Sequence, residues 1–296
     1  MNIGILTFRE QDYHPNNRLI HAALNAGHHV VLLNPKRCYS SLSTGSYSVA
    51  CSKGKLELHA VLPRIGASID QYTLGLVRQF ELQGIRVVND SAAIERTRDK
   101  FRALQELARG GIGIVETCCV NNLQNLRSAV SELGGYPVVL KLRSSRQGRG
   151  VTLAESEETA RFIIENLREP GTGIIVQRFY PIEQRKDIRL LVVGDRVVGA
   201  ALMSPPPGDF RSNVHVGGRG EAIDPGAELS RLALGASRTL GLEIAGVDIV
   251  APKKGDPVVL EVNYAPGFRG LEAATGLDIA REIIGYVSET ETRRPS

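Results

Sequence analysis

Three side chains with oxygen ligands, in the last fifty residues of the sequence, could bind a divalent cation together. Asp248 lies in the segment AGVDIV, and Glu261 and Asn263 lie in VVLEVN; the stretch APKKGDP separates the two segments. If this stretch makes a turn centred on Lys254 and Gly255, the segments form a hairpin in which Asp248 and Glu261 lie opposite each other. Asn263 follows two residues later and therefore lies on the same face of its strand.

Two carboxylates at this spacing repel each other unless a proton or a cation lies between them. Carboxylate and amide oxygens, without His or Cys ligands, favour Mg²⁺ or Mn²⁺ over zinc. Magnesium usually completes its coordination shell with water and with the phosphates of a substrate. The spacing therefore predicts a metal site that acts on a phosphorylated compound, and a solvated face with unrelated polar residues is the alternative.

The segment that carries Glu261 alternates in a way that is typical of a strand with one buried face. Val258, Leu260 and Val262 form one set, and Glu261 and Asn263 belong to the other. We expect the apolar set to face the core and the polar set to face the metal site.

A lysine and two glycines could bind the phosphates that such a metal requires. Lys141 lies in PVVLKL on the face opposite Val138 and Leu140, and a lysine within an apolar strand usually has an anionic partner. The loop QGRG follows, and Gly148 and Gly150 would let backbone N–H groups approach a phosphate. A surface lysine beside an ordinary loop is the alternative. The sequence has no GxxxxGK[ST] loop and no GxGxxG after a strand.

Two further segments carry polar residues of the same kind. In DIRLLVV, Asp187 and Arg189 share one face, so Asp187 could bind ribose hydroxyls or form a salt bridge with Arg189. The Gly- and Pro-rich stretch PPPGDFRSNVHVGG contains Arg211 and Asn213. An arginine in such a loop could bind the oxygens of a transferring phosphate, although an ordinary surface loop has the same composition.

The elements that must position these residues follow two patterns. In the first hundred residues, strand-like and helix-like stretches alternate, which predicts a parallel sheet covered by helices. The expected strands cover residues 3–8, 28–34, 58–66 and 85–89, and the expected helices cover residues 16–27 and 72–84. Ligands of parallel sheets bind beyond the carboxyl ends of the strands, where Arg64 follows AVLP.

The pattern changes at about residue 91 to a second, α+β arrangement. A helical stretch within residues 91–111 ends at Gly110 and Gly111, and SSRQGRGV at residues 144–151 reads as a loop. Gly194 and Asp195 indicate a hairpin. The remaining expected helices cover residues 123–133, 159–169, 226–240 and 278–287, and the expected strands cover residues 114–120, 136–142, 174–180, 187–193, 196–203, 245–250 and 258–263.

Composition limits the classes of function. The 296 residues suit two or three modules, and 42% hydrophobic residues can form a substantial core. A net charge of +4 and few aromatic residues do not favour a nucleic-acid partner. No apolar run is long enough for a membrane helix, and the start MNIGILTF lacks the features of a signal peptide. We expect a cytoplasmic protein whose cysteines Cys38, Cys51, Cys118 and Cys119 are free thiols.

The order of these polar residues, together with several longer motifs, resembles the ATP-grasp superfamily. Within it, the sequence is similar to the bacterial α-L-glutamate ligases, whose type member adds glutamate to the C-terminus of a small-subunit ribosomal protein. The resemblance runs from Met1 to about Val287. It depends on the motifs LPRIGASI, RQFELQGI, TRDK, LARGGIG, FRSNVHVGG, AGVDI and LEVNYAPGFRGLEAATG.

The resemblance implies a fold of the mixed α/β and α+β class. An N-terminal α/β pre-ATP-grasp domain would cover residues 1–96. Two ATP-clasping subdomains would cover residues 97–176 and 177–296, the second with the metal site. Family members often form tetramers, so a homo-oligomer is expected.

The resemblance also implies a role for each matching residue. Lys100 and Lys141 would hold the α- and β-phosphates of ATP, next to Gly148 and Gly150, and Arg178 and Phe179 would meet adenine through backbone groups. Lys141 and Arg211 would be the catalytic residues. The other implied nucleotide ligands are Asp187 at the ribose and Arg211, Ser212 and Asn213 at the γ-phosphate, and the implied ligands of two Mg²⁺ or Mn²⁺ ions are Asp248, Glu261 and Asn263.

The implied activity is an ATP-dependent ligation of a carboxylate to an amine through an acyl phosphate. L-glutamate would be added to the C-terminal carboxylate of a protein or peptide, with Arg64, Arg18 and Arg269 as candidates for binding acidic groups. A ligase for a small-metabolite acceptor and a non-catalytic ATP-binding regulatory module are the alternatives. The sequence departs from the family pattern at Arg178, at Ser144-Ser145-Arg146, at Tyr264-Ala265 and at Arg269. These departures bear on the acceptor more than on ATP.

Overall fold

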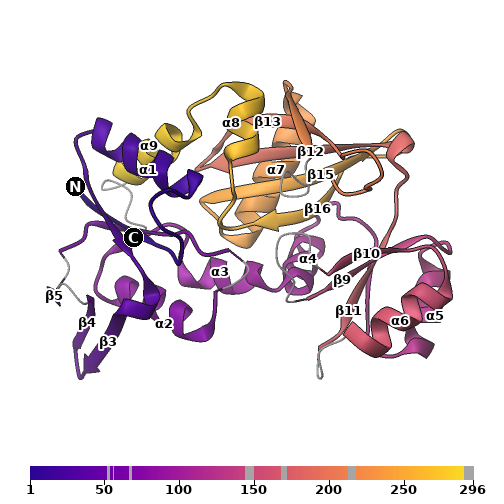
Figure 1. The fold of residues 1–296 in the computed structure, drawn as a ribbon, viewed down its shortest axis with the longest axis horizontal. Helices are drawn as coiled ribbons and strands as arrows, with labels where there is room; N and C mark the ends of the chain where they lie inside the picture. Colours follow the sequence, from indigo (N-terminus) through magenta and orange to yellow (C-terminus); the bar gives the residue numbers. More distant parts are fainter. Residues whose placement is uncertain are drawn as a thin grey trace.

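The computed structural model describes residues 1–51, 54–55, 57–66, 69–143, 150–167, 172–212 and 218–289. Within these ranges the strands form four sheets, and three of them succeed one another along the molecule (Figure 1). Gly148 and Asn213, which the sequence suggested as phosphate ligands, lie outside the described residues. No helix of the described part has the length and apolar character that crossing a membrane requires.

The first sheet is parallel throughout, as the alternation of strands and helices predicted. Its strand order is β2-β1-β6-β7, with β1 at Asn2–Leu6, β2 at His29–Leu33, β6 at Ala60–Pro63 and β7 at Arg86–Val87. Helix α1 (His14–Asn25) follows β1, and α2 (Gln71–Leu82) follows β6. The side chain of Asp70 caps α2 by accepting a hydrogen bond of 2.8 Å from the backbone N–H of Thr73.

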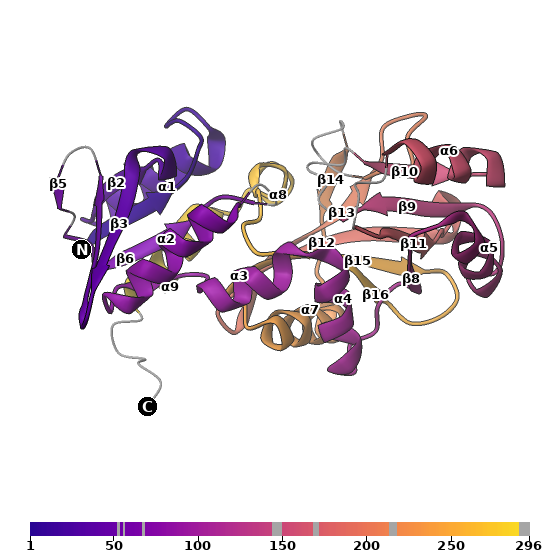
Figure 2. The same ribbon diagram turned by 90° about the horizontal axis from the view of Figure 1, so that it is seen from below.

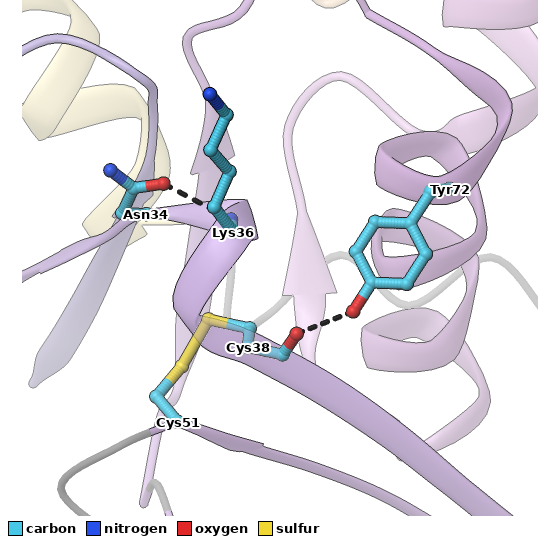
Figure 3. The surroundings of a disulfide bond; sticks show 5 residues. All are labelled: Asn34, Lys36, Cys38, Cys51 and Tyr72. Atoms are coloured by element: carbon cyan, nitrogen blue, oxygen red, sulfur yellow. Dashed lines mark hydrogen bonds between the residues drawn. A yellow bond between two sulfur atoms is a disulfide. The ribbon is translucent and has the colours of Figure 1, made fainter.

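A hairpin that the sequence reading did not predict follows β2. After a short 3-10 turn, η1 (Pro35–Arg37), strand β3 (Cys38–Ser43) pairs antiparallel with β4 (Ser46–Cys51), and β5 (Gly54–Lys55) adds a third strand. Its residues are mostly polar and small, so they lack the apolar alternation on which strand prediction depends. The tyrosine hydroxyl of Tyr72 in α2 donates to the carbonyl of Cys38 and holds the hairpin against the helix (Figure 3).

The expectation of four free thiols is wrong for two of them. Cys38 and Cys51 are directly opposite each other in the hairpin and form a disulfide, while Cys118 and Cys119 are free (Figure 3). The prediction failed because two cysteines 13 residues apart give no sign of their proximity until the intervening residues are known to form a hairpin.

We expect the disulfide to be measurable as a thiol count and as stability. Alkylation of the unfolded, unreduced chain should modify two cysteines, and reduction beforehand should raise the number to four, as read by mass spectrometry. Replacing both Cys38 and Cys51 with serine should lower the free energy of unfolding by about 3 kcal/mol, because the bond closes a short loop in the unfolded chain. Four modified cysteines without reductant would contradict the bond.

The second sheet is antiparallel, with the strand order β10-β9-β11-β8. Its strands are β8 (Thr117–Val120), β9 (Val138–Leu142), β10 (Val151–Ala154) and β11 (Ile174–Arg178). Helices α5 (Leu123–Glu132) and α6 (Glu157–Leu167) pack on the face that contains Val138, Leu140 and Val176. The opposite face, with Lys141 and Gln177, is turned toward the third sheet. Strand β10 begins at Val151, the last residue of the loop expected at residues 144–151, and was not predicted.

The third sheet is also antiparallel and lies beside the second in both views (Figure 1, Figure 2). Its strand order is β14-β13-β12-β15-β16. The strands are β12 (Arg185–Val193), β13 (Arg196–Ser204), β14 (Arg219–Ala222), β15 (Ile244–Pro252) and β16 (Val258–Asn263), with the short turn η2 (Ile182–Gln184) before β12. The expected hairpin at Gly194 and Asp195 joins β12 to β13, and helix α7 (Gly226–Leu240) packs against the sheet.

The helical stretch of residues 91–111 is two helices. α3 (Ser91–Arg98) ends at Asp99, and α4 (Lys100–Arg109) begins after it. Asp99 accepts hydrogen bonds from the backbone N–H groups of Phe101 and Arg102, so its side chain caps the second helix. The break places Lys100 in the first turn of α4, where its side chain reaches β16.

The last two helices return the chain to the first sheet. α8 (Arg269–Thr275) packs on β13 and β14, and α9 (Ile279–Glu289) packs against α1. Ile283 and Ile284 of α9 belong to one buried cluster with Ile3 and Ile5 of β1. A buried residue, Asn89, joins the end of the first sheet to the third sheet: it hydrogen-bonds with Glu243, Ile244 and Tyr264.

Candidate active site

The two carboxylates suggested as metal ligands are paired across neighbouring strands. In the ladder between β15 and β16, Asp248 lies opposite Glu261 and Gly246 lies opposite Asn263, as the assumed register required. Past Asp248 the register shifts by one residue, so that Ile249 pairs with Val259. The strands contain a bulge at this point.

The bulge changes which residues of β16 face the core. Val259 and Val262 are buried, whereas Leu260 lines the cleft beside Glu261. The expectation that Val258 and Leu260 face the core with Val262 is therefore wrong, because an extra residue in one strand reverses the alternation on one side of it. On the turn side of the bulge the strands are one residue out of the assumed register, and the bulge restores that register at Asp248 and Glu261.

Each of the two carboxylates is paired with a basic side chain. Lys100 Nζ lies 2.6 Å from Glu261 Oε1, and Arg189 Nη2 donates to Asp248 Oδ2 at 2.8 Å. Asn263 Nδ2 also donates to Asp248 Oδ2, at 3.2 Å, which leaves the amide oxygen of Asn263 as its ligand atom. Lys100 and Arg189 therefore offset the negative charges of the two facing carboxylates.

The two carboxyl groups have opposite pKa shifts. Burial opposes ionisation of Glu261, but the attraction of Lys100 and Lys141 outweighs it and lowers the pKa to about 2. Burial raises the pKa of Asp248, with a further contribution from Glu261, and Arg189 offsets only part of the rise. Glu261 is thus the fixed negative charge of the pair.

Lys141 lies in β9 on the face turned toward this pair, and its side chain is 7% exposed. Its Nζ forms no ion pair or hydrogen bond with any residue that the structure describes. Burial lowers its pKa to about 8, although the nearby charge of Glu261 acts in the other direction. A buried amine without a bonded anion suits a ligand that brings its own negative charge.

A cleft between the second and third sheets joins these residues. Its volume is about 890 Å³ when the space open to solvent is counted. The suggested site residues that line it are Lys141, Arg178, Phe179, Asp187, Arg211, Ser212, Asp248 and Glu261. A small adjoining cavity contains Lys100. The structure therefore brings together most of the residues that the sequence suggested for ATP and metal.

The residues at the far end of the cleft are held by ion pairs. Arg178 is exposed and pairs with Glu116 at 2.7 Å, and its backbone N–H donates to the Glu116 carbonyl. Asp187 pairs with Arg185 at 2.7 Å, and not with Arg189, which was the alternative drawn from the sequence. The ladder of β12 and β15 places Arg189 directly opposite Asp248, and this explains the different partner.

Two other suggested residues, Arg211 and Gly150, lie next to parts of the chain that the structure does not describe. Arg211 pairs with Asp209 at 2.7 Å, at the end of the described loop after β13. Gly150 has a positive φ of 79°, which favours glycine, and it directly precedes Val151 of β10, which lines the cleft.

The three arginines suggested for substrate binding lie around α8. Arg64 donates to the carbonyl of Pro266 at 2.6 Å and lies over the ring of Phe268. Arg18 pairs with Glu272 and Asp278, so its guanidinium already has two carboxylate partners. Arg269 is exposed at the start of α8. None of the three lines the cleft described above.

Three cleft residues were missed as functional candidates. From the sequence, Arg189 is only a possible partner for Asp187, and Arg185 lies before the strand expected at residues 187–193. Gln177 in β11 is 1% exposed; its Nε2 donates to Thr117, and its Oε1 has no partner among the described residues. A polar residue in an apolar strand, IIVQR, was the available signal for Gln177.

The oxygen ligands fit a hard divalent cation. Asp248 and Glu261 supply carboxylates and Asn263 supplies an amide oxygen, which is the donor set that Mg²⁺ and Mn²⁺ prefer. Within the described ranges there is no cluster of three or more His, Cys, Asp and Glu side chains that could hold a metal by itself. A cation here therefore needs further ligands from water or from a bound phosphate.

Comparison with known families gives this arrangement a name. The model of the RimK PreATP-grasp domain matches residues 1–94, and the model of the RimK-like ATP-grasp domain matches residues 97–287. The chain belongs to the RimK-like family of ATP-grasp ligases. The expected family, the ATP-grasp fold and the ligase class are thereby confirmed.

Individual proteins agree with the family assignment. A protein of Cellvibrio japonicus named probable alpha-L-glutamate ligase is 40% identical over 290 residues, which are 98% of this chain and 96% of that protein. The crystal structure of a RimK domain ATP-grasp protein from Sphaerobacter thermophilus has a TM-score of 0.74 and 28% identity, over 97% of this chain and 99% of that one. The ATP-grasp ligase PsnB, complexed with minimal precursor, Mg and ADP, has a TM-score of 0.75 and 19% identity, over 97% and 96%. At that identity the likeness to PsnB shows the fold alone.

Proposed function

We propose that this chain joins L-glutamate to the C-terminal carboxylate of a peptide or protein, with conversion of ATP to ADP. The observation that carries the proposal is the Asp248–Glu261 pair, which lines the cleft together with the buried Lys141. The name of the 40% identical relative supports glutamate as the amino acid. A peptide acceptor is part of the proposal, and a PsnB complex with a precursor peptide is the example that suggests it.

The nucleotide would lie with its phosphates near the two lysines. Lys141 has no bonded anion among the described residues and would bind the phosphates directly. Lys100 would leave Glu261 for the phosphates when a cation takes its place. Phe179 and Arg178 line the opposite end of the cleft and would meet the base, with Asp187 near the ribose.

Two Mg²⁺ or Mn²⁺ ions bound by Asp248, Glu261 and Asn263 would supply positive charge at the terminal phosphates. The residues of the chain position the reactants for two displacements. An oxygen of the acceptor carboxylate attacks the γ-phosphorus, and ADP leaves. The amino nitrogen of glutamate then attacks the acyl carbon, loses a proton and releases phosphate. Lys141 and Arg211 would stabilise the charge on the phosphoryl oxygens.

The proposal also covers the domain boundaries, the compartment and oligomeric state, and the residues that bind substrate. The chain divides at residues 1–96, 97–176 and 177–296 into a pre-ATP-grasp domain and two subdomains around ATP. It acts in the cytoplasm as a homo-oligomer, a tetramer if it follows its family. Arg64 and Arg269 bind acidic groups of the acceptor or of glutamate where the first sheet meets α8, whereas the ion pairs of Arg18 leave it a structural role.

Mass spectrometry of products tests the activity. The purified chain is incubated with ATP, Mg²⁺, isotope-labelled glutamate and a cell extract, and labelled peptides are sought. An ADP-release assay over candidate carboxylates and amino acids runs in parallel. Labelled protein C-termini support the proposal. A labelled small molecule points to a metabolite acceptor, and ATP binding without stimulated ADP release points to a regulatory module; either result overturns it.

A further inference from the structure

Arg185 connects three segments that surround the cleft. It is the first residue of β12, and its side chain is 10% exposed. The segments are the connection after β11 (residues 179–184), β12 itself, and the loop after β13 (residues 205–212). A long charged side chain is seldom this buried unless most of its donors are satisfied.

The contacts of Arg185 satisfy four of its five N–H donors. Nε and Nη2 donate to the two carboxylate oxygens of Asp187 at 2.7 and 3.0 Å. Nη1 donates to the carbonyl of Tyr180 in the connection, and Nη2 donates to the carbonyl of Phe210 in the loop at 2.6 Å. One guanidinium thus holds one carboxylate and two backbone carbonyls from different segments.

The same contacts fix the ring of Phe179. The guanidinium carbon of Arg185 lies 5.6 Å from the centroid of that ring. The ring of Phe210 lies edge-on to Phe179, with the two centroids 6.1 Å apart. Phe179 therefore packs between Arg185 itself and Phe210, and Arg185 also holds Phe210 through its backbone carbonyl.

Asp187 adds a second contact to the loop, at Ser212, two residues after Phe210. The hydroxyl of Ser212 donates to Asp187 Oδ2, which also accepts from Arg185. Arg211 lies between the two anchored positions, Phe210 and Ser212. The loop that carries this arginine is therefore tied to β12 on both sides of it.

We propose that Arg185 is a positioning residue for nucleotide binding. It holds Phe179, which we propose meets the base, and the loop with Arg211, which we propose meets the phosphates, in one arrangement. The inference rests on the proposed function in one respect, namely that ATP is the ligand of the cleft.

The physical reason lies in the planar shape of the arginine side chain. A guanidinium binds a carboxylate with two parallel hydrogen bonds and still has donors that point outward in the same plane. A lysine keeps the charge beside Asp187 but cannot reach the Tyr180 and Phe210 carbonyls at the same time. A glutamine also leaves the partly buried carboxylate of Asp187 without its cation, which adds to the loss.

The test compares Arg185→Lys and Arg185→Gln with Arg196→Gln. Arg196 is the matched control, because it also pairs with a carboxylate, Glu282 at 3.2 Å, but is exposed and distant from the cleft. ATP affinity is measured by calorimetry with Mg²⁺ present, and thermal melting verifies folding. We expect Arg185→Lys to weaken ATP binding about tenfold, Arg185→Gln more, and Arg196→Gln less than twofold.

Two readouts separate positioning from a general loss of stability. In turnover assays, Arg185→Lys should raise the KM for ATP and leave the KM for the amino acid within twofold. Combined with Ser212→Ala, it should weaken binding by less than the product of the two single effects, since both act through Asp187. If Arg185→Gln does not fold, Arg185→Lys alone decides.

The outcomes are distinct. If the wild-type chain does not bind ATP, the proposed function fails and this inference falls with it. If the wild type binds ATP and folded Arg185→Lys binds it within twofold, only the inference is overturned. A weakening that is fully additive with Ser212→Ala also overturns it, because the two side chains would then act independently.

Discussion

Replacing Glu261 with glutamine should lower ATP turnover more than about 100-fold. Loss of a residue that only orients a metal ligand commonly costs ten- to a hundredfold, and Glu261 would be a ligand itself. The substitution keeps the shape of the side chain and removes the charge that attracts both Lys100 and the cation. The measurement is ADP release at saturating ATP and Mg²⁺.

The fold should survive this substitution. Lys100 would lose its carboxylate partner, but it lies in the first turn of α4 with 18% of its side chain exposed, and it can turn toward the cleft. Glu282→Gln on α9 serves as the matched control, because Glu282 also has a basic partner but lies far from the cleft. Wild-type ADP release by folded Glu261→Gln would rule out its metal role.

Replacing Lys141 with methionine should affect activity and stability in opposite directions. The variant loses the buried cation that faces the carboxylate pair, and we expect ATP turnover to fall about 100-fold or more. Methionine has a similar length and fills the same apolar position without a charge. Below pH 8 the free energy of unfolding should therefore rise by up to about 3 kcal/mol, which is the cost of lowering the pKa from 10.5 to about 8.

The stability difference should depend on pH with a defined sign. Between about pH 8 and pH 10.5 the unfolded chain keeps the Lys141 proton and the folded chain has lost it, so wild-type stability rises with pH. The advantage of Lys141→Met should therefore shrink over this range. Lys254→Met, at an exposed turn position, provides the control. Denaturant titrations at pH 7 and pH 10 measure the effect, and a constant difference would contradict the burial of a charged Lys141.

Much of the fold could be predicted because its strands and helices carry clear apolar periodicity. The parallel first sheet and the antiparallel strands after residue 174 follow from such patterns. The hairpin of Cys38–Cys51 and strand β14 could not be predicted, because their mostly polar residues show no apolar alternation. Strand β10 is apolar but has only four residues, too few for a periodic pattern after a loop-like stretch. The division between α3 and α4 at Asp99 could not be predicted either, because the residues on both sides of it continue one helical pattern.

The candidate site divides along similar lines. The pairing of Asp248 with Glu261 follows from a turn assumed at Lys254 and Gly255, but the pairs nearest the turn are one residue out of that register, and the bulge brings the two carboxylates opposite each other. The bulge itself could not be predicted, since nothing in VVLEVN indicates an extra residue. The partners of Arg189 and Arg185 were also inaccessible, because they depend on which strand lies next to β12 and on the path of the loop after β13. Local sequence predicts faces, whereas neighbours are set by topology.

The packing of α9 has a consequence for synthesis of the chain. The buried cluster that contains Ile3 and Ile5 of β1 is formed by helix α1 and, from the end of the chain, by helix α9. On the ribosome the part of this cluster that packs against α9 stays exposed until α9 emerges. We infer that a fragment ending near residue 94 would aggregate when expressed alone, and that the nascent chain depends on chaperones for most of its translation.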